Sequence, residues 1–294
     1  MTLVVLTPSY APDLELCTGL NRSVLQYAPP DVHHVLIVPP ADVAAFRHLA
    51  NERTTIRTEP EFLPRSFVRL PWVNATLNLR RPFPPVRGWI LQQVLKLAAT
   101  ASMDADVVVL VDSDIEFVRP FSADTFRRDG VVRFYRLPDE IDERLPRHVL
   151  WHRGSRQLLG LPPADPPLPD YVASLIAWDP AIVRDMLDRV ETVTRRRWAD
   201  AVAAQLHFSE WTLYGVYVDA LGSQKARSFS SDTPLCHAWW GTEPLDTHNL
   251  DAFVDNFGEQ DVACMISAKS HTPPHIRRAV LDALRQITST EHTG

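Results

Sequence analysis

Short apolar runs, each closed by proline or polar residues, constrain the fold of this chain most strongly. Residues 3–6, 34–38 and 107–111 are apolar almost throughout and rich in β-branched side chains. Strands of a parallel sheet have this pattern, because helices bury both of their faces. Helical patterns lie between the runs, at residues 41–50 and 88–101. Alternating strands and helices predict an α/β fold with a mainly parallel central sheet flanked by helices.

Two later helices are predicted from their first residues. Asp179 followed by Pro180 is typical of an N-cap and a first helical position, and Ser209 is a second candidate N-cap. The 25 prolines of the chain concentrate in residues 60–85 and 138–169. Because proline interrupts regular elements, we expect both segments to be long irregular loops that serve as lids or as parts of a substrate-binding side.

Composition and charge exclude several classes of function. The 294 residues include 45% hydrophobic side chains and carry a formal net charge of −6. The chain can therefore bury a large core, and it lacks the positive surface of a nucleic-acid-binding protein. No apolar run reaches the length of about 18 residues that is typical of a membrane span. The three cysteines form no C-x-x-C pair, and their odd number argues against a set of disulfides. The first residues do not have the pattern of a signal peptide. We therefore expect a cytoplasmic protein without disulfides.

An acidic pair directly follows the third apolar run. Residues 107–111 lead into Asp112, Ser113 and Asp114, and ligands of α/β sheets bind at the carboxyl ends of the strands. Mg²⁺ and similar cations take oxygen ligands, commonly one or two carboxylates together with substrate phosphates. The pair therefore predicts a metal site that neutralises a diphosphate leaving group. The alternative is an ordinary polar turn, since aspartate and serine favour turns.

The order of motifs along the chain resembles that of GT-A glycosyltransferases. Residues 112–114 look like the D-x-D motif of these enzymes. Residues 7–10 end the first strand, where that fold receives the nucleotide, and residues 88–96 are similar to its donor-contacting helix. From about residue 3 to about residue 278, the chain also resembles a bacterial family formerly catalogued as a domain of unknown function and assigned to this fold. The pattern of that family includes residues 88–96, 112–114, 170–172 and 207–211.

This resemblance implies a single Rossmann-like GT-A domain over residues 1–294. About residues 1–120 would form the nucleotide-binding half, and about residues 121–294 the acceptor-binding and catalytic half. The implied reaction moves a sugar, commonly a hexose, from a nucleotide-diphosphate sugar to a hydroxyl of a small-molecule or glycan acceptor. Mn²⁺ or Mg²⁺ would be the cofactor. A UDP-sugar is favoured as the donor, because UDP is the commonest partner of a D-x-D site.

Two aspartates and a histidine are the metal ligands that the resemblance implies. Asp114 would bind the metal directly, and Asp112 would bind the ribose, the metal or both. The glycogenin-like branch of the fold adds a histidine from a late strand, for which His237 is the candidate and His271 the rival. The chain lacks the His-Phe-Gly-Lys-Pro-Trp ending of that branch, and a single histidine is commonly a packed core side chain.

Donor contacts are expected from the end of the first strand, from one helix face and from the acidic pair, all at one edge of the sheet. Lysines in this set are candidates for phosphate contacts, and their alternative role is that of solvated surface cations. The candidate donor-binding residues are Thr7, Pro8, Ser9, Tyr10, Gln92, Gln93, Lys96, Asp112, Ser113 and Lys269.

Two further carboxylates are candidates for catalysis. Glu210 would take a proton from the acceptor hydroxyl as a general base, with Trp211 beside it to stack on a sugar. Alternatively, Glu210 favours the dipole of the helix that it begins, and Trp211 fills the core. Asp170 precedes an expected strand at residues 171–176. The resemblance implies contacts to the donor sugar in this region, and a simple turn residue is the alternative.

Other uses of the acidic pair remain open at the level of sequence. A haloacid-dehalogenase-like phosphatase has Asp-x-Asp after its first strand, followed by threonine or valine, whereas Ile115 follows here. A nucleotidyltransferase usually begins with a glycine-rich phosphate loop, and residues 7–13 contain no glycine. A nucleotide-sugar-binding protein without catalysis is the non-enzymatic alternative, against which the intact acidic pair and Glu210 argue.

Overall fold

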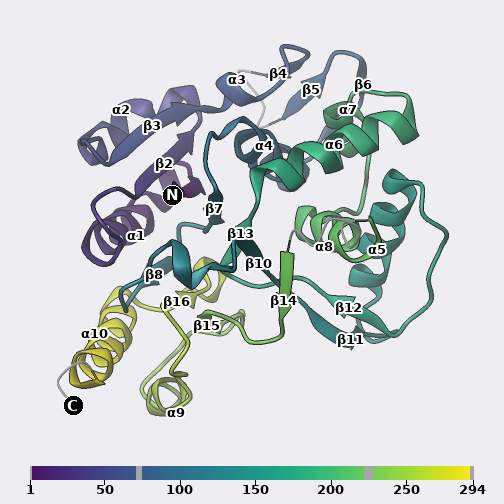
Figure 1. Cartoon of the computed structure of the whole chain (residues 1–294). Coiled ribbons are helices and arrows are strands. Elements are labelled where there is room, and N and C mark those ends of the chain that lie inside the picture. Colours follow the sequence, from purple (N-terminus) through teal and green to yellow (C-terminus); the bar gives the residue numbers. More distant parts are fainter. Residues whose placement is uncertain (1, 71–74, 222–227, 292–294) are drawn as a thin grey trace.

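A five-stranded sheet organises the structure, a computed structural model that describes residues 2–70, 75–221 and 228–291 (Figure 1). Its strands are β1 (Leu3–Pro8), β2 (His33–Val38), β3 (Thr54–Thr58), β7 (Val107–Leu110) and β13 (Ile176–Trp178). They lie in the order β13-β7-β1-β2-β3. β13 runs antiparallel to β7, and the other strands are parallel to one another. The predicted single-domain α/β fold with a mainly parallel sheet is therefore confirmed.

Helices take up much of the remaining chain. The part of the chain that the structure describes has no helix with the length and apolar character needed to cross a membrane. The longer helices are α1 (Leu14–Tyr27), α4 (Gly88–Ser102), α5 (Pro146–Leu159), α6 (Pro180–Thr194), α8 (Glu210–Leu221) and α10 (Pro274–Glu291). Short ones are α3 (Glu59–Phe62), α7 (Trp198–Ala203), α9 (Leu250–Asp255), η1 (Ala11–Asp13), η4 (Ala123–Thr125) and η6 (Ala268–Ser270).

Small sheets surround the central one. They contain β4 (Phe67–Arg69), β5 (Thr76–Asn78) and β6 (Arg81–Val86); β8 (Ile115–Phe117), β15 (Cys236–Trp239) and β16 (Ala263–Ile266); β9 (Arg127–Arg128), β10 (Val131–Tyr135) and β14 (Ser228–Ser231); and β11 (Leu137–Ile141) with β12 (Leu168–Asp170). In Figure 1 most of them lie below the central sheet, between α10 and α5.

Successive residues of the central strands point into two different cores. Val4 and Leu6 of β1 share a core with apolar residues of α4, α6 and α8, whereas Leu3 and Val5 share one with residues of α1. This alternation is the period-two pattern of a strand. Helices therefore bury both faces of the sheet, and the carboxyl ends of its parallel strands come together at one edge.

The predicted boundaries are close for the strands and for one long helix. β1, β2 and β7 coincide with the three apolar runs to within two residues, and α4 coincides with the helix predicted at 88–101 to within one. The helix expected at residues 41–50 is wrong. Only Phe46 and Leu49 are buried there, so little packing favours a continuous helix. The segment forms η2 (Pro40–Asp42), α2 (Val43–Phe46) and η3 (Arg47–Leu49) instead.

The proline-rich segments are not irregular loops, contrary to the prediction. Residues 71–74 lie outside the described residues. The rest of 60–85 holds β4, β5 and all but the last residue of β6, and residues 138–169 hold α5 between β11 and β12. The prolines occupy positions where a missing N–H costs little. Pro146 is the first residue of α5, and three prolines lie in β6, an edge strand. The strand expected at residues 171–176 is also wrong, because β12 ends at Asp170 and β13 begins at Ile176.

Both predicted helix caps are present. Oδ1 of Asp179 accepts a hydrogen bond from the N–H of Ala181 at 2.7 Å at the start of α6. Oγ of Ser209 accepts one from the N–H of Thr212 at 3.3 Å at the start of α8. The second cap determines where α8 begins, and Glu210 is consequently its first residue.

Gly215 allows α8 to pack directly against Tyr171. A Cβ atom at this position would lie 2.2 Å from the buried Tyr171 ring. We expect Gly215→Ala to lower the free energy of unfolding by about 1–3 kcal/mol, because the added methyl group must displace the ring or the helix. Urea unfolding measures the change. Gly88→Ala is the control, since a Cβ there meets nothing within 4 Å, and equal stabilities of the two variants would contradict the prediction.

A buried polar network lies beneath the end of β1. His34 is fully buried, with Nε2 3.0 Å from Oγ1 of Thr7 and Nδ1 3.0 Å from Nδ2 of Asn21. Asn21 also donates to Oγ1 of Thr54 at 2.8 Å. Because the Asn21 amide is a donor, Nδ1 accepts, and the ring proton is on Nε2 and donates to Thr7. Burial lowers the pKa of His34 to about 3.

Acid is expected to destabilise the protein through His34. A histidine whose pKa is lowered by folding binds a proton more readily in the unfolded chain, so stability is lost as the pH falls from 6.5 toward about 3. This group alone contributes a slope of about 1.4 kcal/mol per pH unit in that range. Urea unfolding as a function of pH measures the slope. His34→Gln should remove this part of it, and the exposed His33→Gln should not; a wild-type slope in His34→Gln would contradict the assignment.

Candidate functional site

Three charged side chains from distant parts of the chain meet at the carboxyl edge of the central sheet. Nζ of Lys96 lies 2.9 Å from Oδ1 of Asp112 and 3.5 Å from Oε1 of Glu210. Lys96 comes from α4, Asp112 follows β7, and Glu210 begins α8. The structure thus brings together two of the predicted donor-binding residues and a predicted catalytic carboxylate. We call these three side chains the charged cluster.

Neighbouring side chains hold the charged cluster in place. Oε1 of the buried Gln93 accepts a hydrogen bond from the N–H of Glu210 at 2.9 Å, while its Nε2 donates to the carbonyl of Trp89 at 3.2 Å. The ring of Trp211 lies 4.8 Å from Nζ of Lys96, in a cation–π contact. Gln93 therefore positions Glu210, whereas the sequence analysis predicted that Gln93 contacts the nucleotide-sugar donor. The adjacent Gln92 is half-buried.

The charged cluster contains two almost fully buried charges and one that reaches solvent. The side chains of Lys96 and Glu210 are 4% and 1% exposed, and that of Asp112 is 41% exposed. Burial would lower the pKa of Lys96, but Asp112 and Glu210 outweigh it and raise that pKa. Burial raises the pKa of Glu210, and Lys96 offsets part of this effect. Lys96 is therefore a permanent cation, and Glu210 binds a proton more readily than an exposed glutamate.

Two polar atoms of the cluster region have no partner. Within the described chain, Oε2 of Glu210 and Nε1 of Trp211 are buried without a hydrogen bond or an ion pair. Oδ1 of Asp112 is also buried without a hydrogen bond, but it has the ion pair with Lys96. A buried polar atom left unpaired costs about 1–3 kcal/mol, so such atoms are uncommon unless a ligand or water completes them. An acceptor and a donor beside a buried cation can bind a polar ligand and exchange a proton with it.

The end of β1 places its polar residues in different ways. Oγ of Ser113 donates to Oγ of Ser9 at 2.9 Å, which ties the end of β1 to the turn after β7. Tyr10 is 49% exposed at this edge, and Pro8 is the last residue of β1. Thr7 faces the His34 network instead. Thr7, Pro8, Ser9 and Tyr10 are the predicted donor-binding residues of this segment. Among them, Ser9 and Tyr10 have hydroxyl groups that do not bind His34.

The second aspartate of the acidic pair has different neighbours from the first. Oδ2 of Asp114 accepts a hydrogen bond from the N–H of Ala268 at 2.8 Å. Burial raises the pKa of Asp114, and the charge of Arg277 on α10 partly opposes the rise. Both residues line a cavity of only about 10 Å³. Lys269, the residue after Ala268, is exposed. Asp112 thus contacts Lys96, whereas Asp114 contacts the turn after β16.

The predicted third metal ligand does not join the acidic pair. Nε2 of His237 lies 2.7 Å from the carbonyl oxygen of Phe253, and the two rings pack 4.1 Å apart. Its rival His271 is exposed and directly follows η6. No three His, Cys, Asp or Glu side chains among residues 2–70, 75–221 and 228–291 are grouped so that they could hold a metal ion. The expected set of Asp112, Asp114 and His237 is therefore not assembled.

Asp170 belongs to another group of side chains. Its Oδ1 accepts from the N–H of Val172 at 3.0 Å and lies 3.8 Å from Nδ1 of His148. The His148 ring packs 4.3 Å from that of Trp151. Among the contacts of the described residues, none joins the Asp170 carboxylate to the charged cluster. Its bond to the N–H two residues on is that of a turn residue, the alternative that the sequence left open.

Two ionisable residues near the acidic pair were not predicted from the sequence. Burial and the charge of Asp112 raise the pKa of Asp13, which identifies Asp13 as a neighbour of the charged cluster. It lies three residues after Tyr10, so the polar end of the first strand was a usable signal for it. Arg277 lies in α10, and nothing in the surrounding sequence distinguishes it from other helical arginines.

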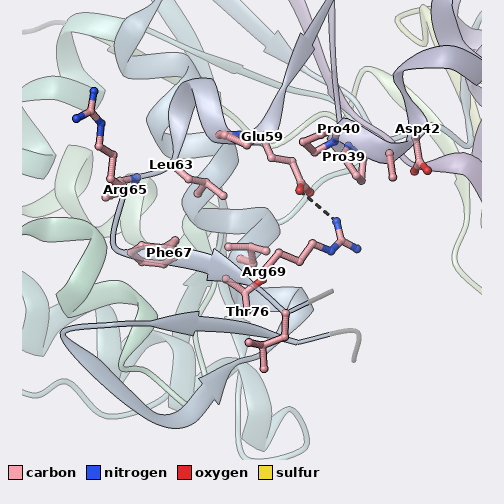
Figure 2. A pocket seen from close by; sticks show the side chains of 14 residues that line it. Pro39, Pro40, Asp42, Glu59, Leu63, Arg65, Phe67, Arg69 and Thr76 are labelled. Atoms are coloured by element: carbon pink, nitrogen blue, oxygen red, sulfur yellow. Dashed lines mark hydrogen bonds and ion pairs between the residues drawn. The ribbon is translucent and has the colours of Figure 1, made fainter. Parts of the chain in front are cut away.

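A cavity of about 860 Å³ opens beyond the ends of β2 and β3 (Figure 2). Several prolines, Leu63 and Phe67 line it, and an ion pair of 3.2 Å joins Glu59 to Arg69 across it. Leu91 of α4 belongs to its wall, whereas the three residues of the charged cluster do not. A cavity of this size suits a small organic molecule. We take the charged cluster as the candidate site, because Lys96 and Glu210 are almost fully buried there and Oε2 of Glu210 has no hydrogen-bond partner among the described residues.

Comparison with known proteins identifies a family and no activity. A family model described as "Family of unknown function (DUF6492)" matches residues 3–289 of this chain. No curated protein matches the chain. The description of the family assigns no reaction, ligand or cofactor, so the function has to be inferred from the geometry of the charged cluster and its surroundings.

Proposed function

The chain belongs to this family of unknown function, and from the charged cluster we propose that it is a metal-dependent glycosyltransferase. The proposed reaction transfers a sugar from a nucleotide-diphosphate sugar, with a UDP-sugar as the favoured donor, to a hydroxyl of a small-molecule or glycan acceptor. We place this reaction in the cytoplasm, where thiols such as those of the three free, buried cysteines stay reduced.

One observation carries the proposal. A buried lysine lies between two carboxylates at the edge of the sheet where α/β proteins bind their ligands. Buried ion clusters contribute little stability compared with apolar residues of similar volume. Here the cluster also leaves Oε2 of Glu210 without a partner among the described residues. A cluster that adds little stability and keeps an unpaired acceptor supports a role in binding and proton transfer.

The three residues suit different parts of the proposed reaction. Lys96 supplies a fixed positive charge beside the exposed side of Asp112, where it can attract the phosphates of a donor. Glu210 suits a general base, because its raised pKa strengthens its attraction for the proton of an acceptor hydroxyl. The hydroxyl groups of Tyr10 and Ser9 lie at the same edge and are suited to contact the nucleotide.

A metal ion fits this site with fewer protein ligands than the three that were predicted. Bound Mn²⁺ or Mg²⁺ would neutralise the diphosphate leaving group. Asp112 is suited to hold it, because its side chain is 41% exposed, whereas Asp114 and His237 are each engaged by a backbone group. Mg²⁺ is commonly held by one or two carboxylates, with water and phosphate oxygens as its other ligands. We therefore propose Asp112 as the main protein ligand.

Release of nucleoside diphosphate tests the proposed function. The purified protein is incubated with a panel of nucleotide sugars and Mn²⁺, and the products are separated by chromatography. Slow release of nucleoside diphosphate, with heat-inactivated protein as the control, is the expected result. Inorganic phosphate from phosphomonoesters would identify a phosphatase, and pyrophosphate would identify a nucleotidyltransferase. Binding without turnover of any donor would identify a binding protein, and each of these outcomes contradicts the proposal.

A further inference from the structure

A second cavity, of about 490 Å³, lies beside the small sheet of β9, β10 and β14. Four arginines and two aspartates are among the residues that line it, and none of these belongs to the charged cluster. The four guanidinium groups come from one stretch of ten residues, 127–136, that contains a single acidic residue. The charged lining residues of this arginine cavity are Arg127, Arg128, Arg133, Arg136, Asp124 and Asp232.

Protein contacts hold each guanidinium group in place. Arg133 is 9% exposed and donates from Nη2 to Oγ of Ser231 at 2.7 Å and to the carbonyl of Thr233. Arg128 lies over the ring of Phe229, with Cζ 4.7 Å from the ring centre. These contacts limit the motion of both side chains, so little freedom is lost when they bind a ligand.

The two remaining arginines are held at the ends of the same stretch. Nε of Arg136 donates to Oδ2 of Asp219 at 2.7 Å, and Nη2 of Arg127 donates to the carbonyl of Gly130. In the part of the chain that the structure describes, Nε of Arg127 is buried and has no hydrogen-bond partner. Hydrogen bonds therefore position three of the four guanidinium groups, and the exposed Arg128 packs on a ring at the rim of the cavity.

Two of the four arginines in this cavity have carboxylate partners outside its lining. Arg136 lies 2.7 Å from Asp219, and Arg127 lies 3.8 Å from Asp106, so Arg128 and Arg133 are the cations that an anion in the cavity would complete. Within residues 2–70, 75–221 and 228–291, no ion pair joins Arg128 or Arg133 to a carboxylate. Burial lowers the pKa of Arg133, the charge of Asp232 partly opposes this change, and the charge of Arg128 adds a smaller lowering. A buried guanidinium group without an ion pair is costly unless an anion completes it.

We propose that the arginine cavity binds a phosphate group carried on a small molecule. Guanidinium groups bind phosphate oxygens in a bidentate geometry, and several of them around one cavity favour a dianion over a monoanion. The volume of about 490 Å³ exceeds what inorganic phosphate fills, which leaves room for an organic part. This site is separate from the charged cluster, and the inference does not depend on the proposed glycosyl transfer.

Calorimetric titration tests the site with three probes: inorganic phosphate, sulfate and a sugar phosphate. Saturable binding of the sugar phosphate is expected, and Arg128→Gln should weaken it by about ten- to a hundredfold, the effect of losing a hydrogen bond to a charged group. Arg128 is exposed at the cavity rim, so the variant should fold. Arg153→Gln, an exposed arginine on α5, is the matched control and should bind like the wild type.

The outcomes distinguish a phosphate ester from free phosphate as the ligand, and the arginine cavity from the charged cluster as the binding site. Tighter binding of the sugar phosphate than of inorganic phosphate supports the proposed phosphate ester, and equal binding contradicts it, because the free anion would then be a sufficient ligand. Absence of saturable binding to the wild-type protein overturns the proposal. Binding that survives Arg128→Gln but is lost in Lys96→Met also overturns it, because the phosphate would then occupy the charged cluster.

Discussion

Glu210→Gln is expected to reduce turnover by about two to four decades while the affinity for the donor stays nearly unchanged. Glutamine keeps the size of the side chain and its place at the start of α8, where Gln93 holds its N–H at 2.9 Å. It cannot accept a proton from an acceptor hydroxyl. Turnover and donor binding measured on one sample distinguish this role from donor binding, in which the affinity would fall as well.

The pH dependence of turnover and stability gives a second measure of the same carboxylate. A general base must be ionised, so turnover should rise with pH through the raised pKa of Glu210. A carboxyl group whose pKa is raised by folding stabilises the protein in its protonated form. Its contribution is present below the unfolded pKa of 4.5 and is lost as the pH rises through the folded pKa. The wild type should therefore lose stability relative to Glu210→Gln over this range.

Glu116→Gln is the matched control for Glu210→Gln. Glu116 has a raised pKa like Glu210, although it is only partly buried, and it forms an ion pair of 2.8 Å with Arg285 instead of one with Lys96. Its replacement should lower stability and leave turnover unchanged. Wild-type turnover in Glu210→Gln, together with a lowered stability, would leave only the helix-dipole role for Glu210.

Strand ends could be predicted from the sequence because a buried strand is apolar and the residues that follow it are polar or proline. β1, β2 and β7 are apolar on both faces and stop at polar residues or prolines, so their positions and the shared carboxyl edge follow from local sequence. Lys96 and Glu210 were candidates from their helices, yet their contact depends on how α4 and α8 pack on the sheet. Sequence spacing does not determine a contact between residues so far apart along the chain.

Side-chain partners were the least predictable feature of the site. Thr7 and Gln93 were expected to face a nucleotide, and each is bound by another protein group, His34 in one case and the N–H of Glu210 in the other. A short polar residue at a strand end suits a ligand and a buried network equally well. The proline-rich segments were mispredicted for a related reason, because proline is excluded from element interiors but not from edge strands and first helical turns.

Chelation of divalent metal with EDTA is expected to reduce release of nucleoside diphosphate to background, and Mn²⁺ or Mg²⁺ should restore it. The metal would offset the charge that develops on the diphosphate. This effect would lower the activation free energy by several kcal/mol. Asp112→Asn keeps the shape of the turn after β7 but removes the exposed charge that we propose as the protein ligand. Its turnover at saturating Mn²⁺ should fall by about a hundredfold or more.

Asp114→Asn separates the metal ligand from the structural half of the acidic pair. Oδ2 of Asp114 accepts a hydrogen bond from the N–H of Ala268, and the amide oxygen of the substituted side chain can still accept this bond. This variant should retain a response to Mn²⁺, whereas Asp112→Asn should lose it. The exposed Asp31→Asn is the control for a change of charge alone and should behave like the wild type. Full turnover of the wild-type protein in EDTA would contradict metal dependence, and a normal Mn²⁺ response in Asp112→Asn would show that another residue holds the ion.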